Sequence, residues 1–185
     1  MRKSFGAKPL CYPQPVFIIA AYDENGAACA MNAAWGGISD DAEISMCLSP
    51  SHRTVKNILE TGAFTVSMAT EKFTAECDYL GVASGNKVPD KLEKCGFHTE
   101  KAGSVNAPVI AELPMTIECR LKSYDPESCR MVGEIVDVTA DESILTGGNI
   151  DPQKLRPIIF DSANRDYLAI GAKVGNAFED GMKIK

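Results

Sequence analysis

The stretch from Pro15 to Trp35, PVFIIAAYDENGAACAMNAAW, decides the fold that this sequence predicts. Two apolar runs flank Asn25 and Gly26. An Asn-Gly pair between two such runs is the strongest short-range signal for a β-hairpin. We therefore expect residues 16–35 to form two antiparallel strands.

The segment after this hairpin predicts a strand followed by a helix. The Gly-Gly pair at 36–37 and the acidic turn at 40–41 are expected to separate the hairpin from a third strand, EISMCLSP, which ends at Pro50. The hydrophobic period then changes within SPSHRTVKNILETG. Apolar residues recur three and four positions apart, as on one face of a helix, at Val55, Ile58 and Leu59. Gly62 is expected to end this helix as a left-handed cap.

The rest of the chain adds mostly strands. AFTVSMA predicts another strand. Phe73, Cys77 and Leu80 share one face of a second predicted helix, and GVASGNKVPDK is expected to be a loop. The run from Met115 to Lys122 alternates, which predicts a strand with Thr116, Glu118, Arg120 and Lys122 on a solvent-exposed face. MVGEIVDVTA and PIIFD predict two further strands, and YLAIGAKVGNAF a short strand or helix.

About seven strands and two to three helices follow from these patterns, with short turns between successive strands. This order disfavours a doubly wound parallel sheet and favours a mainly β fold, an antiparallel split β-barrel with two to three inserted helices. No repeat or linker divides the chain, so residues 1–185 are expected to form a single domain.

The composition excludes several classes of function. The 185 residues carry a formal net charge of -6 and contain no run of basic residues, which argues against binding nucleic acid or an anionic membrane. No apolar stretch is long enough to span a bilayer, and prolines replace the apolar helix of a signal peptide. A cytoplasmic protein is therefore expected.

The seven cysteines predict neither disulfides nor a metal site. Their number is odd and no CxxC pair occurs. Cys47 and Cys119 lie among apolar neighbours, where a thiol behaves as a small buried hydrophobe. Only two histidines are present, which excludes a histidine-rich metal site.

The segment from Ser49 to Lys56, SPSHRTVK, is a candidate anion site. It runs from the end of a strand into the start of a helix, where free backbone N–H groups and the helix dipole attract an anion. Arg53 offers a two-pronged donor, Lys56 a mobile charge, and the hydroxyls single hydrogen bonds. The alternative is that Ser51 only caps the helix while both cations lie on its solvent-exposed face.

The small-residue stretch AMNAAWGGIS is a second candidate, because it holds the only tryptophan. Small residues let the backbone approach a flat ligand, whose polar edge the backbone N–H and C=O groups can then bind. The alternative is that Trp35 is a large core residue.

Four segments together resemble the flavin reductase-like family with the FMN-binding split barrel, and most of all its flavoredoxins. They are AMNAAWGG, LSPSHRTVKNILETGAFTVS, SGNKVPDKLEKCGF and NAPVIAELPMTIECRL, and they span roughly residues 15–140 in the order of the family. The resemblance implies a six-stranded antiparallel barrel and a homodimer. It also implies one FMN per protomer near the subunit interface.

The resemblance implies three groups of cofactor-binding residues. The first, expected along the isoalloxazine ring and the ribityl chain, comprises Asn32, Ala33, Ala34, Trp35, Leu48 and Ser49. The second falls on the phosphate-binding turn and comprises Ser51, His52, Arg53, Thr54 and Lys56. The third lies in a loop that approaches the flavin and comprises Lys87 and Lys91. No catalytic side chain is assigned.

The activity implied by the resemblance is electron transfer. An oxidoreductase of this kind takes electrons from NAD(P)H or from a protein donor and passes them through bound flavin to an acceptor. Three alternatives stay open. They are an electron carrier that nicotinamide does not reduce directly, a non-catalytic flavin-binding or sensor module, and a barrel that binds no cofactor.

Overall fold

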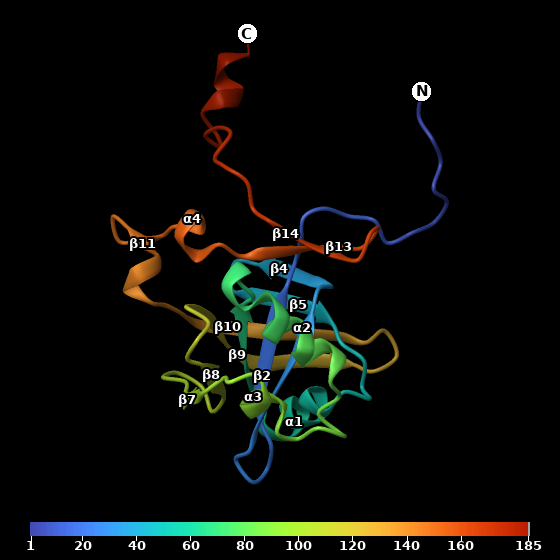
Figure 1. The fold of residues 1–185 in the computed structure, drawn as a ribbon, viewed down its shortest axis with the longest axis vertical. Helices are drawn as coiled ribbons and strands as arrows, with labels where there is room; N and C mark the ends of the chain where they lie inside the picture. The colour runs from blue at the N-terminus through green and yellow to red at the C-terminus, as the bar shows by residue number, and fades with distance from the viewer. Residues whose placement is uncertain (185) are drawn as a thin grey trace.

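The chain folds around a seven-stranded antiparallel sheet in the computed structural model, which describes residues 1–184 (Figure 1). The strand order is β3-β2-β6-β9-β10-β5-β4, and every neighbouring pair is antiparallel. The strands are β2 (Phe17–Tyr22), β3 (Ala28–Ala33), β4 (Gly36–Asp40), β5 (Glu43–Cys47), β6 (Ala63–Met68), β9 (Met115–Asp125) and β10 (Arg130–Ala140).

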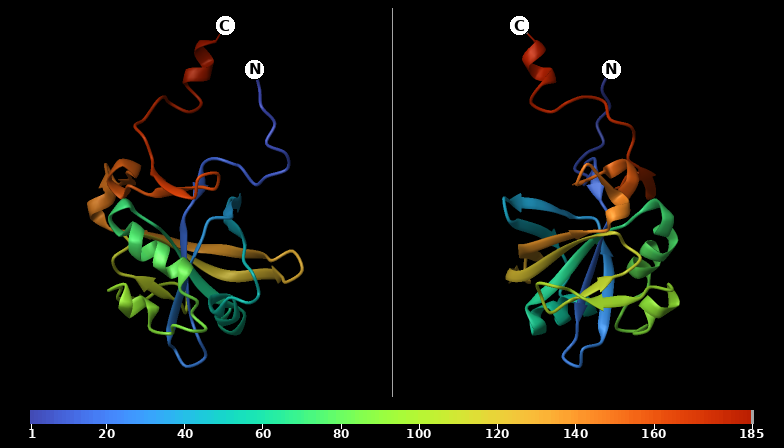
Figure 2. Two further views of the ribbon diagram at one scale, coloured as in Figure 1. Left: turned by 45° about the vertical axis from the view of Figure 1, so that its right-hand side comes forward. Right: turned by 90° about the vertical axis from the view of Figure 1, so that its left-hand side faces the viewer.

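The connection between β3 and β4 shows that this sheet curls. The two strands form opposite edges of the sheet, yet only Ala34 and Trp35 separate them in the chain. Three Cα-to-Cα steps, from Ala33 to Gly36, span at most about 11 Å, so the edges must approach each other at this point. Figure 2 shows the resulting curved, partly open barrel. The predicted antiparallel split β-barrel is confirmed, with seven strands where the resemblance implies six.

The predicted hairpin and the two longer helices are present. β2 pairs with β3 from Phe17 opposite Ala33 to Tyr22 opposite Ala28. The longer helices are α1 (Arg53–Thr61) and α2 (Thr74–Val82), and Gly62 ends α1 in the left-handed conformation with φ 69°. Short helical segments are α3 (Lys91–Lys94), α4 (Pro152–Leu155), η1 (Glu71–Phe73), η2 (Glu142–Ile144) and η3 (Asp180–Lys183).

Three local predictions are wrong. The Gly36-Gly37 pair does not break the chain but belongs to β4, because pairing with β5 supplies its backbone hydrogen bonds. Thr116 and Glu118 are buried rather than exposed. Glu118 accepts hydrogen bonds from the backbone N–H groups of a loop that covers this part of β9. Cys47 is exposed, since its side chain alternates away from the buried Met46.

Smaller sheets extend the barrel. β1 (Gln14–Pro15), β13 (Ile158–Asp161) and β14 (Asp166–Ala169) form one of them, β7 (Thr99–Lys101) pairs with β8 (Pro108–Ile110), and β11 (Leu145–Thr146) pairs with β12 (Asn149–Ile150). The N-terminal and C-terminal segments both leave the body at the end that carries β13 and β14 (Figures 1 and 2). Within residues 1–184, no helix is long and apolar enough to cross a bilayer.

The buried core has two main layers, one on each face of the sheet. One layer packs α1 against the sheet and includes Ile19, Ile58 and Phe64. The other packs α2 and α3 against the opposite face and includes Ile18 and Leu80. The alternation of Ile18 and Ile19 along β2 explains why this strand is apolar throughout, since both of its faces are covered.

Gly133→Ala is expected to destabilise the fold by about 1–3 kcal/mol, because the interior is close-packed and resists an added methyl group. A Cβ atom at Gly133 would overlap the ring carbons of the fully buried Phe64 and approach Cys119 Cβ at 3.3 Å. Urea unfolding measures the loss. Gly37→Ala is the matched control, because a Cβ atom there meets nothing within 4 Å. Equal stability losses in the two variants would contradict the prediction.

Candidate functional site

The turn between β5 and α1 gathers hydroxyl groups at the start of the helix. The hydroxyls of Ser49 and Ser51 lie 2.9 Å apart, and the Ser51 N–H donates to Ser49 Oγ over 3.4 Å. Asn86 Nδ2 donates to the carbonyl oxygen of Ser51 over 3.0 Å, which ties this turn to the loop that follows α2. The turn is therefore held in one conformation with both serines exposed or half-exposed.

The N-terminus of α1 carries no side-chain cap. The N-cap residue is His52, whose side chain makes no capping hydrogen bond, and no acidic residue stands in the first turn. The alternative that Ser51 caps the helix is therefore wrong. The first turn of an α-helix leaves backbone N–H groups without partners and carries partial positive charge. No side chain of the cap or the first turn therefore competes with an anion at this helix end.

A hollow of about 170 Å³ lies beside this helix end. It is lined by residues of β3, α1, α2, α3 and the loop after α2: Met31, Asn32, His52, Arg53, Thr54, Leu80, Gly81, Val82, Ala83, Ser84, Gly85 and Lys91. Sites for whole small-molecule ligands usually enclose about 300–1,000 Å³. The hollow is therefore large enough for a phosphate-sized group but not for an entire nucleotide.

Lys91 places a buried cation in the wall of this hollow. The residue is only 3% exposed, and its Nζ donates to the carbonyl oxygens of Leu80 and Ala83 at 2.8 Å each. Burial lowers the pKa of Lys91. Burial, and then the nearby charge of Lys91, lowers the pKa of His52. An ammonium group has three N–H donors, so one remains for a ligand.

Arg53 is already engaged on one side. Its Nη2 lies 3.0 Å from Asp23 Oδ2, and its Nε donates to Asn57 Oδ1 over 3.0 Å. Asp23 also accepts from the backbone N–H of Ala27, and this bond, more than the pairing with Arg53, lowers the pKa of its carboxyl group. Arg53 can therefore offer an anion only its remaining N–H groups unless Asp23 releases it.

Eight of the thirteen sequence-predicted residues do not line the hollow: Ala33, Ala34, Trp35, Leu48, Ser49, Ser51, Lys56 and Lys87. Lys56 and Lys87 are both exposed and outside its lining, although the Lys87 N–H donates to the carbonyl oxygen of Ser84, which is part of the lining. Leu48 is buried in the core, where its N–H donates to the Cys129 carbonyl and its own carbonyl accepts from Tyr124. Leu48 supports the turn from within the core, and its backbone polar groups are already paired.

Trp35 lies on the neighbouring surface rather than in the core. The residue is 52% exposed, so the alternative of a core tryptophan is wrong. It lines an open groove of about 530 Å³ together with Gly36, Gly37, Ile38, Ser39, Ser45, Met46, Cys47, Ser128 and Arg130. Ala33 and Ala34 are half-buried and connect Asn32 in the hollow to Trp35 in the groove. The polar hollow and the aromatic groove are thus joined by a short stretch of small side chains.

Residues 10–158 match the flavin reductase like domain. This protein belongs to the flavin reductase-like family. The resemblance noted in the sequence is thereby confirmed.

Solved structures of similar proteins agree with this assignment. A flavoredoxin of Desulfovibrio vulgaris (Miyazaki F) is 36% identical, with a TM-score of 0.94 over 98% of this chain and 100% of the other. A flavoredoxin from Methanosarcina acetivorans is 25% identical, with a TM-score of 0.86 over 98% and 96%. An FMN-binding domain of a flavin reductase-like enzyme from Shewanella baltica OS155 is 20% identical, with a TM-score of 0.78 over 88% and 89%.

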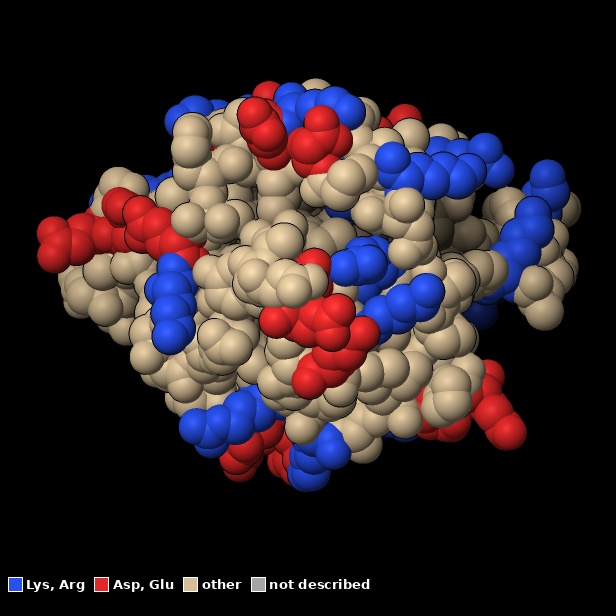
Figure 3. Space-filling view, turned by 90° about the horizontal axis from the view of Figure 1, so that it is seen from below, with Lys and Arg blue, Asp and Glu red and all other residues tan. Residues whose placement is uncertain are grey.

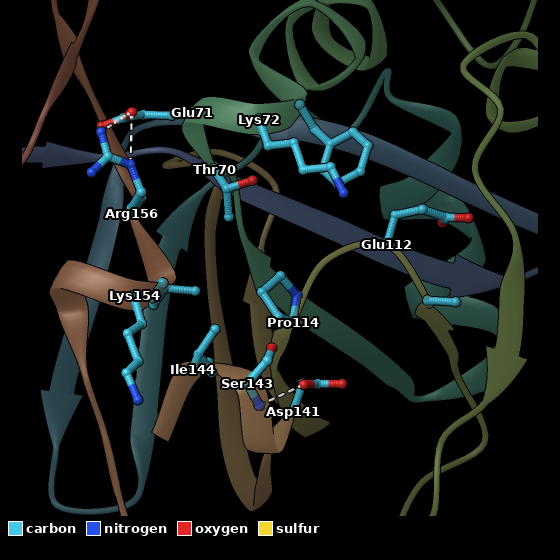
Figure 4. Close-up of a pocket in the computed structure, with 13 residues that line it drawn as sticks. Thr70, Glu71, Lys72, Glu112, Pro114, Asp141, Ser143, Ile144, Lys154 and Arg156 are labelled. Carbon is cyan, nitrogen blue, oxygen red and sulfur yellow. Dashed lines mark hydrogen bonds and ion pairs between the residues drawn. The ribbon is translucent and has the colours of Figure 1, made fainter. Parts of the chain in front are cut away.

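A larger cavity of about 640 Å³ lies elsewhere on this flavin reductase-like fold (Figure 4). None of the sequence-predicted cofactor residues lines it. Its rim carries an ion pair in which Arg156 Nε donates to Glu71 Oε2 over 2.9 Å, and Asp141 accepts from the backbone N–H of Ser143. Since Arg156 and Glu71 pair with each other and none of the sequence-predicted residues reaches this cavity, the smaller hollow beside α1 is the better candidate site.

Parts of the hollow carry no signal in the sequence. The segment from Leu80 to Gly85 forms one wall because α2 ends there, and no motif marks it. Asp23 reaches Arg53 across 30 positions of sequence. On the end of the molecule that carries α1, acidic and basic side chains lie interspersed, without an extended patch of one sign (Figure 3). The electrostatic potential at the hollow is therefore set by the individual charged side chains next to it.

Proposed function

We propose that this flavin reductase-like protein binds FMN and passes electrons through it, from NAD(P)H or a protein donor to an acceptor. The observation that carries the proposal is the uncapped N-terminus of α1, which opens beside the buried ammonium group of Lys91. A helix N-terminus with an adjacent cation suits a phosphate monoester. The FMN-binding relative from Shewanella baltica supports the choice of this nucleotide.

The residues of the site fit the two ends of FMN. In this proposal the phosphate is held by the hydroxyls of Ser49, Ser51 and Thr54, the first N–H groups of α1, the remaining N–H groups of Arg53 and the ammonium group of Lys91. The exposed ring of Trp35 and the small side chains before it hold the flat ring system. When bound, FMN supplies the redox chemistry, and the protein supplies position and charge. No side chain is assigned as acid or base.

We also propose that a second copy of the chain completes the site. The hollow holds only a phosphate-sized group, and the groove at Trp35 is open to solvent on one side. A homodimer that covers this groove would shield the ring system from water. Sedimentation at micromolar concentration is expected to give a dimer, and a monomer that binds FMN with full affinity would contradict this part of the proposal.

The test of FMN binding is a titration followed by the loss of FMN fluorescence and by the visible absorption spectrum. The purified protein is expected to be yellow, or to bind added FMN in a 1:1 ratio per chain. Riboflavin, which lacks the phosphate, is the matched ligand control and is expected to bind more weakly. A colourless protein with no affinity for FMN would contradict the proposal.

The likeness to two flavoredoxins favours a second candidate, a carrier that a partner protein reduces. Stopped-flow bleaching of the bound FMN by NADH and by NADPH separates the two candidates. Rapid bleaching by either nicotinamide supports a flavin reductase. Bleaching by dithionite alone supports a carrier, or a non-catalytic flavin module if no protein donor reduces it.

A further inference from the structure

Three residues from separate elements form a hydrogen-bonded chain at the wall of the hollow. Asn32 belongs to β3, Asp78 to α2 and Tyr167 to β14. The Tyr167 hydroxyl lies 2.8 Å from Asp78 Oδ1, and Asn32 Nδ2 lies 3.4 Å from the same hydroxyl. Asn32 Nδ2 also donates to the carbonyl oxygen of Cys77 over 3.0 Å. Asn32 is the member of this chain that lines the hollow.

This chain of hydrogen bonds has one direction. A carboxylate only accepts hydrogen bonds, so the Tyr167 O–H must donate to Asp78. The Tyr167 oxygen is then an acceptor and receives an N–H from Asn32. The second N–H of Asn32 goes to the Cys77 carbonyl, which also only accepts. Both amide donors of Asn32 are therefore used, and its Oδ1 is left as the group available to a ligand.

The protonation state of Tyr167 keeps this direction constant. Burial, followed by the hydrogen bond to Asp78, raises the pKa of Tyr167 to about 12. The hydroxyl therefore retains its proton at any ordinary working pH. The donors and acceptors in the Asn32–Tyr167–Asp78 hydrogen bonds thus keep their roles.

We propose that Asp78 and Tyr167 are positioning residues, which hold the Asn32 amide so that its Oδ1 accepts a hydrogen bond from the ligand. The inference rests on the proposed binding of FMN and adds the polarity of one contact. An acceptor at this wall selects a ligand group that donates, and FMN offers such donors in the N3–H of its ring and in its ribityl hydroxyls. A ligand carbonyl at the same point would face Oδ1 without a hydrogen atom between them.

The test is a double-mutant cycle on FMN affinity, with Asn32→Ala, Tyr167→Phe and the double variant. Loss of one hydrogen bond typically weakens binding by roughly threefold to tenfold. We expect losses in this range for both single variants, and no further loss when Tyr167→Phe is added to Asn32→Ala, because Tyr167 acts through Asn32. Tyr12→Phe is the matched control, since Tyr12 also donates to a carboxylate, that of Asp161, but does not line the hollow.

The melting temperature of each variant, measured without FMN, separates positioning from folding. Additive losses in the cycle, or unchanged FMN affinity in a folded Tyr167→Phe variant, would overturn the inference while the proposed FMN binding stands. A wild-type protein that does not bind FMN would overturn the proposed function and this inference with it.

Ligand analogues on the wild-type protein test the same contact without a change at Tyr167. If N3–H is the donor, 3-methyl-FMN is expected to bind the wild type more weakly than FMN does, but to bind Asn32→Ala as well as FMN does. If a ribityl hydroxyl is the donor, an analogue that lacks this hydroxyl is expected to show the same pattern. Penalties that do not depend on Asn32 for any of these analogues would refute an acceptor role for Oδ1.

Discussion

Lys91→Met is expected to lower FMN affinity by roughly tenfold to a hundredfold and the free energy of unfolding by about 2–3 kcal/mol. Two carbonyl oxygens, of Leu80 and Ala83, lose the ammonium group that satisfies them. The hollow also loses the buried ammonium group of Lys91. The third N–H of this group is available for a charge-assisted hydrogen bond to phosphate. FMN titration and urea unfolding measure the two effects separately.

Lys94→Met is the matched control for this substitution. Lys94 belongs to the same short helix, but its side chain is exposed and pairs with Asp90 on the surface. Surface ion pairs contribute little, so both the FMN affinity and the stability of this variant are expected to stay close to the wild-type values. Equal loss of affinity in the two variants would mean that only the net charge of the chain matters, which contradicts the assignment of Lys91 to the hollow.

The features that the sequence predicts correctly are those with local causes. The β2–β3 hairpin follows from Asn25-Gly26 between two apolar runs, and α1 follows from its apolar period and from Gly62. Both signals lie within about a dozen residues. The anion-binding character of the α1 N-terminus is likewise local, because it depends on a strand that runs directly into a helix without a capping side chain.

The features that the sequence does not predict depend on contacts between distant segments. Glu118 looks solvent-exposed from its alternation, but the backbone N–H groups of Gly103 and Ser104 cover it. Gly36 and Gly37 look like a chain break, but β5 pairs with them and makes them an edge strand. In both cases tertiary hydrogen bonding overrides a local preference.

The candidate site shows the same division. His52 and Thr54 follow directly from the helix start, whereas Lys91 enters the hollow only because α3 packs beside the end of α2. The resemblance to the family supplied Lys91 as a candidate, and its buried hydrogen bonds give a physical reason for it. No sequence pattern predicts the pairing of Asp23 with Arg53. This pairing changes how strongly Arg53 and Lys56, the two cations of α1, are expected to contribute to anion binding.

Arg53→Ala is expected to weaken FMN binding by about tenfold, whereas Lys56→Ala is expected to change it by less than about twofold. Arg53 lines the hollow and carries a charged donor, and one charged hydrogen bond is worth about this factor. Lys56 is exposed outside the lining, where solvent and salt screen its charge. FMN titration of both variants at two salt concentrations measures the difference, and equal effects would contradict it.

Asp23→Asn tests whether Asp23 competes with the phosphate for Arg53. Asp23 Oδ2 competes with a bound phosphate for the Arg53 guanidinium, while its Oδ1 accepts from the backbone N–H groups of Asn25 and Ala27. An asparagine keeps an oxygen for the turn and removes the competing charge. FMN affinity is therefore expected to rise by about threefold, with a stability cost of about 1–3 kcal/mol, because the Asp23 side chain is only 11% exposed and its charge strengthens the bonds that it accepts. Weaker binding in Asp23→Asn would instead mean that Asp23 orients Arg53 toward the phosphate.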